Sequence, residues 1–269
     1  AKMEKFAGYA FNKSHAACYA FLAYQTAYLR YYYYSFFMAS MINNRINKWD
    51  DMTHYIAEVR VKGKVVLPPD INKSASLFTV ADDNDSIRFG LSAIKNVGEG
   101  VVDAIIAERE AHGDFTSFMD FCKRVPAEAL NKRCIESLIL AGCFDGLGAY
   151  RSQLMSIYPT AVKAVTNDKK AADMGQITLF AEIKTDDVDV TLPNIKEYDQ
   201  LTKLRFEKEY VGMYLSGHPL QEYLDSFNQF SFNTSKLPKE NDDTDEKAEA
   251  ETNDESEENQ MAEPEYEDG

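Results

Sequence analysis

Cysteine, histidine and tryptophan are scarce in this chain of 269 residues, which has four, four and one of them. No CxxC pair occurs and no histidine stands at ligand spacing, so a zinc site is not predicted. Scattered thiols of this kind favour a reduced, cytoplasmic protein in which the cysteines are buried. The four are Cys18, Cys122, Cys134 and Cys143.

Long uninterrupted apolar runs are also missing. The stretch from Ala16 to Met41 contains Gln25, Arg30 and many tyrosines, so we expect no membrane span there. No secretion signal is visible. The chain opens on Ala1 within what reads as a packed element, which suggests a piece of a longer protein.

Catalytic patterns are missing as well. No two aspartates flank a single spacer within an apolar strand, which is the arrangement expected of a two-metal phosphoryl-transfer site. We find no Walker loop and no Ser/His/Asp set. We therefore expect no catalytic residue, no metal ligand and no cofactor in this piece.

The net charge of −15 belongs to one end of the chain. Between Glu240 and Gly269 lie 15 of the 44 acidic residues and one of the 29 basic ones, so the rest carries 29 acidic against 28 basic residues. The acidity therefore does not exclude nucleic-acid binding by the globular part. Beyond about Lys236 the composition predicts a disordered tail, because it offers too little apolar surface to offset chain entropy.

The apolar pattern predicts a mainly α fold with a small β-hairpin. Strand signals occur at 64–67, 76–80 and 87–89, the last two joined by a turn rich in aspartate. Apolar residues recur at helical spacing in the remaining segments, and Ser14 is suited to cap the first helix. The helices expected are 14–31, 35–43, 49–61, 92–96, 101–109, 115–124, 130–141, 150–165 and 197–214.

The segment Ala93–Ile105 has the form of a helix-hairpin-helix. Its glycines, Gly98 and Gly100, allow a sharp turn and a close approach of the backbone to a phosphate. Backbone amides there, with Lys95, Val97 and Glu99, then form the predicted DNA contact, which fixes position without reading sequence. The alternative is a glycine-rich hairpin that merely packs.

A second hairpin is predicted over Leu130–Leu154, with glycines 142, 146 and 148 in its turn. Lys132 and Arg133 stand nearby and are predicted DNA-binding residues. Two hairpins in tandem favour DNA binding more than one does, although the modest charge predicts weak, salt-sensitive binding by this piece alone.

Two further motifs have competing interpretations. Gln176, Leu179 and Phe180 stand in a polar stretch, where a linker has no intramolecular reason to carry two apolar anchors; such peptides insert into a partner's pocket, or else dock back onto their own domain. The second motif, at the start of the first helix, suits a triphosphate and a stacked base, although a capped helix start accounts for it equally well. It comprises Asn12, Lys13, His15 and Tyr19.

Taken together, the motifs resemble the α subunit of bacterial DNA polymerase III, a C-family polymerase. The resemblance rests on blocks that cover roughly residues 4–230: FAGYAFNKSHAACYAFLAYQTAYL, LPPDIN, IRFGLSAIKNVGEG, LNKRCIESLILAGCFDGLG, GQITLF and EKEYVGMYLSGHPL. It implies residues 1–75 from the fingers domain, 76–165 as tandem helix-hairpin-helix, 166–200 as a linker with a sliding-clamp motif, 201–235 leading towards an OB domain, and 236–269 as the acidic tail.

The resemblance also implies partners and chemistry. Asn12, Lys13, His15 and Tyr19 fall where the family lines its incoming-nucleotide site, and Gln176, Leu179 and Phe180 align with its internal motif for the β sliding clamp. The palm aspartates that hold Mg²⁺ lie outside this sequence, as does the τ-binding end that contacts other holoenzyme subunits. We therefore expect a DNA-directed DNA polymerase as the parent, acting on primer-template DNA and dNTPs, and an inactive piece here. The alternatives are a stand-alone non-catalytic module for DNA and clamp, and a helical interaction protein.

Overall fold

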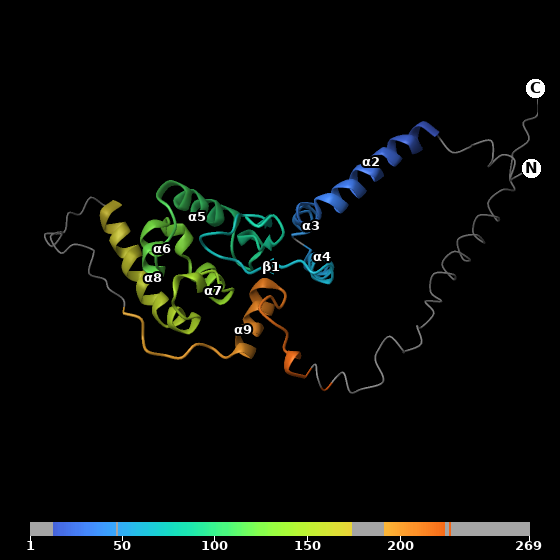
Figure 1. The fold of residues 1–269 in the computed structure, drawn as a ribbon. Helices are drawn as coiled ribbons and strands as arrows, with labels where there is room; N and C mark the ends of the chain where they lie inside the picture. Colours follow the sequence, from blue (N-terminus) through green and yellow to red (C-terminus); the bar gives the residue numbers. More distant parts are fainter. Residues whose placement is uncertain (1–12, 47, 174–190, 224–225, 227–269) are drawn as a thin grey trace, which may run out of the picture. The chain divides into compact units, whose positions relative to one another are not determined.

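The computed structural model describes residues 13–46, 48–173, 191–223 and 226 (Figure 1). The chain divides into two compact units, Ala1–Pro219 and Leu220–Gly269. The second unit contributes one described element, the 3-10 turn η6 (Gln221–Tyr223). All other elements below belong to the first unit, and the mainly helical fold with a small sheet is confirmed.

Three helices open the described chain, as the apolar spacing predicts. They are α2 (Lys13–Tyr32), α3 (Tyr34–Asn43) and α4 (Trp49–Val61). Helices α3 and α4 turn Met38, Ile42, Met52, Ile56 and Val59 into the core. Helix α2 begins one residue before Ser14, so Ser14 lies in its first turn and not at its cap.

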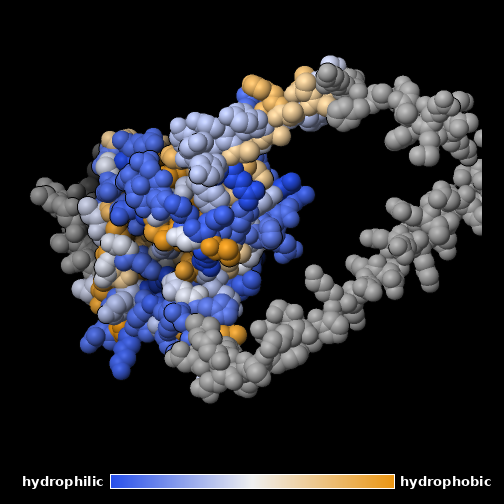
Figure 2. All heavy atoms as spheres, turned by 45° about the vertical axis from the view of Figure 1, so that its right-hand side comes forward, coloured by the Kyte–Doolittle hydropathy of each residue, from blue (hydrophilic) through white to orange (hydrophobic). Residues whose placement is uncertain are grey.

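Helix α2 leaves its apolar residues exposed. Tyr19, Phe21 and Tyr24 are 60%, 63% and 67% exposed, and Figure 2 shows hydrophobic atoms along this helix. Cys18 lies on it and is exposed too, whereas Cys122, Cys134 and Cys143 are buried. The expectation that all four thiols are buried is therefore wrong for Cys18. Burial raises the pKa of the other three.

A three-stranded sheet joins these helices to the rest. Strand β3 (Ile87–Arg88) lies between β1 (Val66–Leu67), with which it is parallel, and β2 (Thr79–Val80), with which it is antiparallel. The predicted hairpin is thus confirmed. The Asn43 side chain exchanges two hydrogen bonds of 2.9 Å with the backbone of Phe78, which ties α3 to the strand region.

The next elements form the two hairpins and differ from expectation in their ends. The expected helix over 92–96 is only the 3-10 turn η1 (Leu91–Ala93), because Ile94 is extended and Asn96 has a positive φ of 64°. Helix α8 runs on to Asp173 through the internal Pro159. The others are α5 (Glu99–His112), α6 (Phe118–Arg124), η2 (Ala127–Leu130), α7 (Lys132–Leu140), η3 (Asp145–Leu147) and α8 (Arg151–Asp173).

The expected helix over 197–214 is two elements. Helix α9 (Gln200–Phe206) starts late because the Asp199 side chain caps the Thr202 N–H at 2.7 Å. It continues as the π turn η5 (Glu207–Val211), which ends at Gly212 in the left-handed conformation. The Lys95 N–H donates to the carbonyl of Tyr210 at 3.0 Å, so η5 packs on the first hairpin.

One hydrophobic cluster links these elements, from Met38 in α3 to Met213 after η5. Within it, the aromatic rings of α6 and its neighbours meet edge to face with centroids 5.0–5.2 Å apart. Residues on both sides of position 75 share the cluster, while the domain boundaries suggested by the sequence stay a prediction.

Candidate nucleic-acid interface

The first hairpin comprises residues 91–112, and its turn is held from two sides. Its Asn96 adopts a left-handed conformation, which asparagine tolerates better than most residues, and donates to the Ser137 hydroxyl of α7 at 3.1 Å. Lys95 is bound through its backbone to η5, and its side chain is exposed. Val97 is 7% exposed, so its side chain packs in the core.

The glycines of this turn are not required by the fold around them. Gly98 has an ordinary φ of −82°, and a Cβ added to Gly98 or Gly100 would meet no atom within 4 Å. Gly98 is the N-cap of α5 and offers no side chain to it. The amides of Gly98, Glu99 and Gly100 donate to no backbone acceptor among the described residues. The start of α5 is thus an open row of N–H donors that suits a phosphate, with the exposed carboxylate of Glu99 opposing one.

The second hairpin comprises residues 132–173, and its turn is filled by its own side chains. Gly142 has a φ of +88°, and a Cβ there would overlap the guanidinium of Arg151 and lie 2.9 Å from Asp145 Oδ2. That guanidinium is bound to Asp145 at 2.6 Å and to the Leu140 carbonyl at 3.0 Å. Arg151 is only 5% exposed. The glycine here makes room for the buried Arg151 guanidinium, which pairs with the exposed Asp145, and leaves no open cradle.

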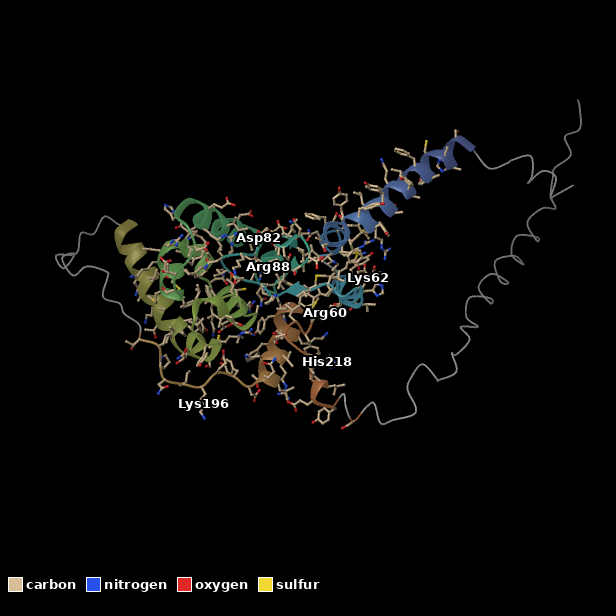
Figure 3. The ribbon with its side chains drawn as sticks, in the orientation of Figure 1. Arg60, Lys62, Asp82, Arg88, Lys196 and His218 are labelled. Carbon is tan, nitrogen blue, oxygen red and sulfur yellow. The ribbon has the colours of Figure 1, made fainter. Side chains whose placement is uncertain are left out.

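The start of α8 already binds a carboxylate from the chain itself. Glu197 accepts the N–H groups of Arg151 at 3.0 Å, Ser152 at 3.2 Å and Tyr198 at 2.8 Å. Partial burial raises the pKa of Glu197, but these donors outweigh that effect, and the pKa lies below its ordinary value. The Ser152 hydroxyl also donates to the Lys196 carbonyl at 2.9 Å. Figure 3 shows Lys196 on the segment before α9, with its side chain directed away from the helices.

The two hairpins therefore differ in kind. In the sequence, both α5 and α8 follow a turn that contains glycine. In the structure, the N–H groups at the start of α5 are open, whereas those at the start of α8 are capped by Glu197. Glu197 has no local sequence signal, because it caps a helix that starts 46 residues before it, whereas Arg151 binds Asp145 and Leu140 within the same hairpin. Asn96 has a local signal, since asparagine in a glycine-bearing turn tolerates the left-handed conformation.

Lys132 and Arg133 lie at the start of α7, which spans nine residues. They are thus about 13 Å along the helix from the glycine turn near which the sequence suggests they stand. Asn131 caps this helix through the Cys134 N–H at 2.9 Å, and no acidic residue lies in its first turn. Lys132 Nζ is 3.8 Å from Glu136, an exposed pair of little energetic weight.

Two of the four expected nucleotide-site residues can be placed. His15 and Tyr19 lie one turn apart on α2, with ring centroids 4.6 Å apart and edge to face. Lys13 begins the helix, but its side chain lies outside the described residues, as does the whole of Asn12. The nucleotide-site role stays a prediction.

The clamp motif Gln176, Leu179 and Phe180 also lies outside the described residues. Both its flanks are described: α8 ends at Asp173, and Pro193 accepts a hydrogen bond of 2.9 Å from Gln153 near the start of α8. Clamp binding stays a prediction as well.

Metal-ligand clusters and membrane-spanning helices are both missing from the part of the chain that the structure describes. That part contains no group of three His, Cys, Asp or Glu side chains fit to hold a metal ion. None of its helices is long and apolar enough to span a membrane.

Comparison with known proteins identifies the family and supports the helix-hairpin-helix motif. A family model described as "Helix-hairpin-helix motif" matches residues 63–154. The DNA polymerase III subunit alpha of Borreliella burgdorferi is 43% identical over 232 residues, 85% of this chain and 20% of that protein. The proteins of the same name from Thermus aquaticus and Vibrio cholerae are 42% and 39% identical over 82% and 85% of this chain, or 18% and 20% of their own length. The chain spans about a fifth of the length of these relatives, and it belongs to the family of bacterial DNA polymerase III α subunits, matching a region that contains the helix-hairpin-helix motif.

Proposed function

We propose that this chain is the part of a replicative DNA polymerase that holds duplex DNA by its backbone and binds a sliding clamp. DNA synthesis itself is proposed only for a full-length α subunit like those of the relatives. That proposal includes the dNTP substrate, the magnesium ions and the further holoenzyme subunits. The chain alone is expected not to extend a primer, because the sequence offers no palm carboxylates.

One observation supports the DNA contact most directly. The start of α5 presents uncapped amides beside Gly98 and Gly100, and neither glycine is demanded by a positive φ or by a close neighbour. Glycine costs helix stability, so its presence at Gly100 is explained by something outside the chain that must come close. A DNA phosphate has the charge and the acceptors that this position suits.

The test replaces Gly100 with leucine, which fits the open space on this side of α5. We expect the free energy of unfolding to stay the same or rise, because leucine is a better helix former than glycine. Affinity for a fluorescein-labelled duplex, measured by anisotropy at low salt, should fall at least several-fold. Ala107→Leu is the matched control, since Ala107 is exposed on the same helix two turns further on.

The competing interpretation is that the hairpin only packs. It would be favoured if Gly100→Leu bound duplex as tightly as the wild type, or if it unfolded the chain. The open space around Gly100 makes the second outcome unexpected.

A further inference from the structure

Helices α7 and α8 border an open pocket of about 400 Å³ that lies outside both hairpin turns. Part of its lining is apolar and comes from α8: Tyr158, Pro159 and Val162. The rest is polar and offers only hydrogen-bond donors or groups able to donate: Lys132, Lys163, Thr166 and Asn167.

The charge of this pocket is positive. Lys132 comes from the first turn of α7 and Lys163 from the middle of α8, and no described residue pairs with Lys163. The acidic neighbour, Glu136, accepts a hydrogen bond from the Tyr158 hydroxyl and lies 3.8 Å from Lys132. Arg133 adds an exposed cation beside Lys132, again with no partner among the described residues. An anion is the ligand that these groups suit.

We propose that this pocket binds a backbone phosphate of DNA, with Lys163 and Lys132 supplying charge and Thr166 and Asn167 supplying neutral donors. The apolar part, with Val162, accommodates the adjoining sugar. This inference rests on the proposed DNA-binding function and extends it, because Lys163 lies beyond the 63–154 range that matches the helix-hairpin-helix motif. It also gives Lys132 and Arg133 a place to act that does not involve the filled turn at Gly142.

The position of the pocket favours a nucleic acid over an acidic peptide as its ligand. The pocket shares Lys132 with the predicted DNA contacts, and Lys132 belongs to the same matched helix-hairpin-helix region as the open start of α5. A duplex presents phosphates at regular intervals, so two separate anion sites on one module suit one continuous backbone.

The experiment measures duplex affinity of the full chain by anisotropy at several salt concentrations. The slope of log K against log [salt] should fall by about 0.9 for every phosphate that the protein no longer neutralises. Lys163→Gln is expected to reduce the slope by about that amount and the affinity near 50 mM salt by several-fold. Lys62→Gln, an exposed lysine at the end of α4 (Figure 3), is the matched control and should leave the slope unchanged.

A second variant separates hydrogen bonding from charge. Thr166→Val removes a hydroxyl and keeps the shape, so it should weaken binding without changing the slope. Circular dichroism checks that each variant is folded.

Three outcomes overturn the inference. If Lys163→Gln behaves as Lys62→Gln while Gly100→Leu still weakens binding, this pocket is not a DNA site and the proposed function stands. If Lys163→Gln loses affinity for a poly-glutamate peptide and not for duplex, the occupant is an acidic protein. If the wild-type chain binds no duplex at all, the proposed function fails with the inference.

Discussion

Gly212 lies against the indole ring of Trp49, so closely that a Cβ on Gly212 would overlap the ring atoms Cε3 and Cζ3. Gly212 also has a φ of +84°, a backbone conformation that residues with a Cβ rarely adopt. This contact joins η5 to the start of α4. We expect Gly212→Ala to lower the free energy of unfolding by about 2–4 kcal/mol, from overlap and backbone strain together.

Trp49 is the chain's single tryptophan, so its fluorescence follows this junction directly. Urea unfolding monitored by emission measures the effect. Gly100→Ala is the control, and its free energy of unfolding should rise by up to about 1 kcal/mol, because the new Cβ enters open space on a helix. Equal stability of Gly212→Ala and the wild type would contradict the close packing.

Arg124 holds the end of α6 through a planar set of donors. Its guanidinium binds Glu108 and Asp120, each at 3.0 Å, and lies 4.4 Å from the centre of the Phe115 ring. Lysine keeps the charge but cannot reproduce that fork, so Arg124→Lys should cost about 2–3 kcal/mol of unfolding free energy. Calorimetry would show it, with Arg133→Lys at an exposed site as the control; equal losses in both would rule out the role given to the fork.

Glu197 should make stability depend on pH in the acid range. Because its folded pKa lies below the ordinary value of 4.5, its carboxylate stabilises the fold above that pH, and the contribution is lost as the pH falls through the folded pKa. We expect Glu197→Gln to lower stability by about 1–2 kcal/mol at pH 7 and to flatten the acid dependence.

Thermal melts between about pH 3 and 7 measure this for both proteins. Glu110→Gln, an exposed glutamate on α5, is the charge-matched control and should leave the melting curve nearly unchanged. A mutant at Glu197 with the same acid slope as the wild type would show that the cap does not titrate as described.

The clamp motif gives a test that does not depend on the described residues. Changing Leu179 and Phe180 to alanine should abolish binding to a β sliding clamp in a fluorescence titration, because both apolar anchors are removed. Ile177→Ala alters a spacer within the same five residues and should bind nearly as well as the wild type. An unchanged affinity of the double variant would remove clamp binding from the proposed function.

Local features of this chain could be predicted from its sequence, and long-range ones could not. The helix over 49–61 and the strand pair at 79–88 follow from spacing and turn residues within a few positions. The cap on α8 comes from Glu197, 46 residues after Arg151, and Gly212 meets a tryptophan that precedes it by more than half the chain. Such contacts depend on tertiary packing, for which no nearby residue gives a signal.

The two glycine turns look equivalent in the sequence for the same reason, because the contacts that distinguish them depend on the fold. Both offer glycines between helices, and only the fold shows that the turn at Gly142 encloses Arg151 while the start of α5 at Gly98 stays open.

The anchoring of Pro193 and Glu197 near the start of α8 has a mechanical consequence. The chain leaves this helix at Asp173 and is fixed again at its other end, about 35 Å away for 23 residues. A partner bound at residues 176–180 is then connected to the module through the chain on both sides of the motif. Its effective concentration next to the module rises accordingly.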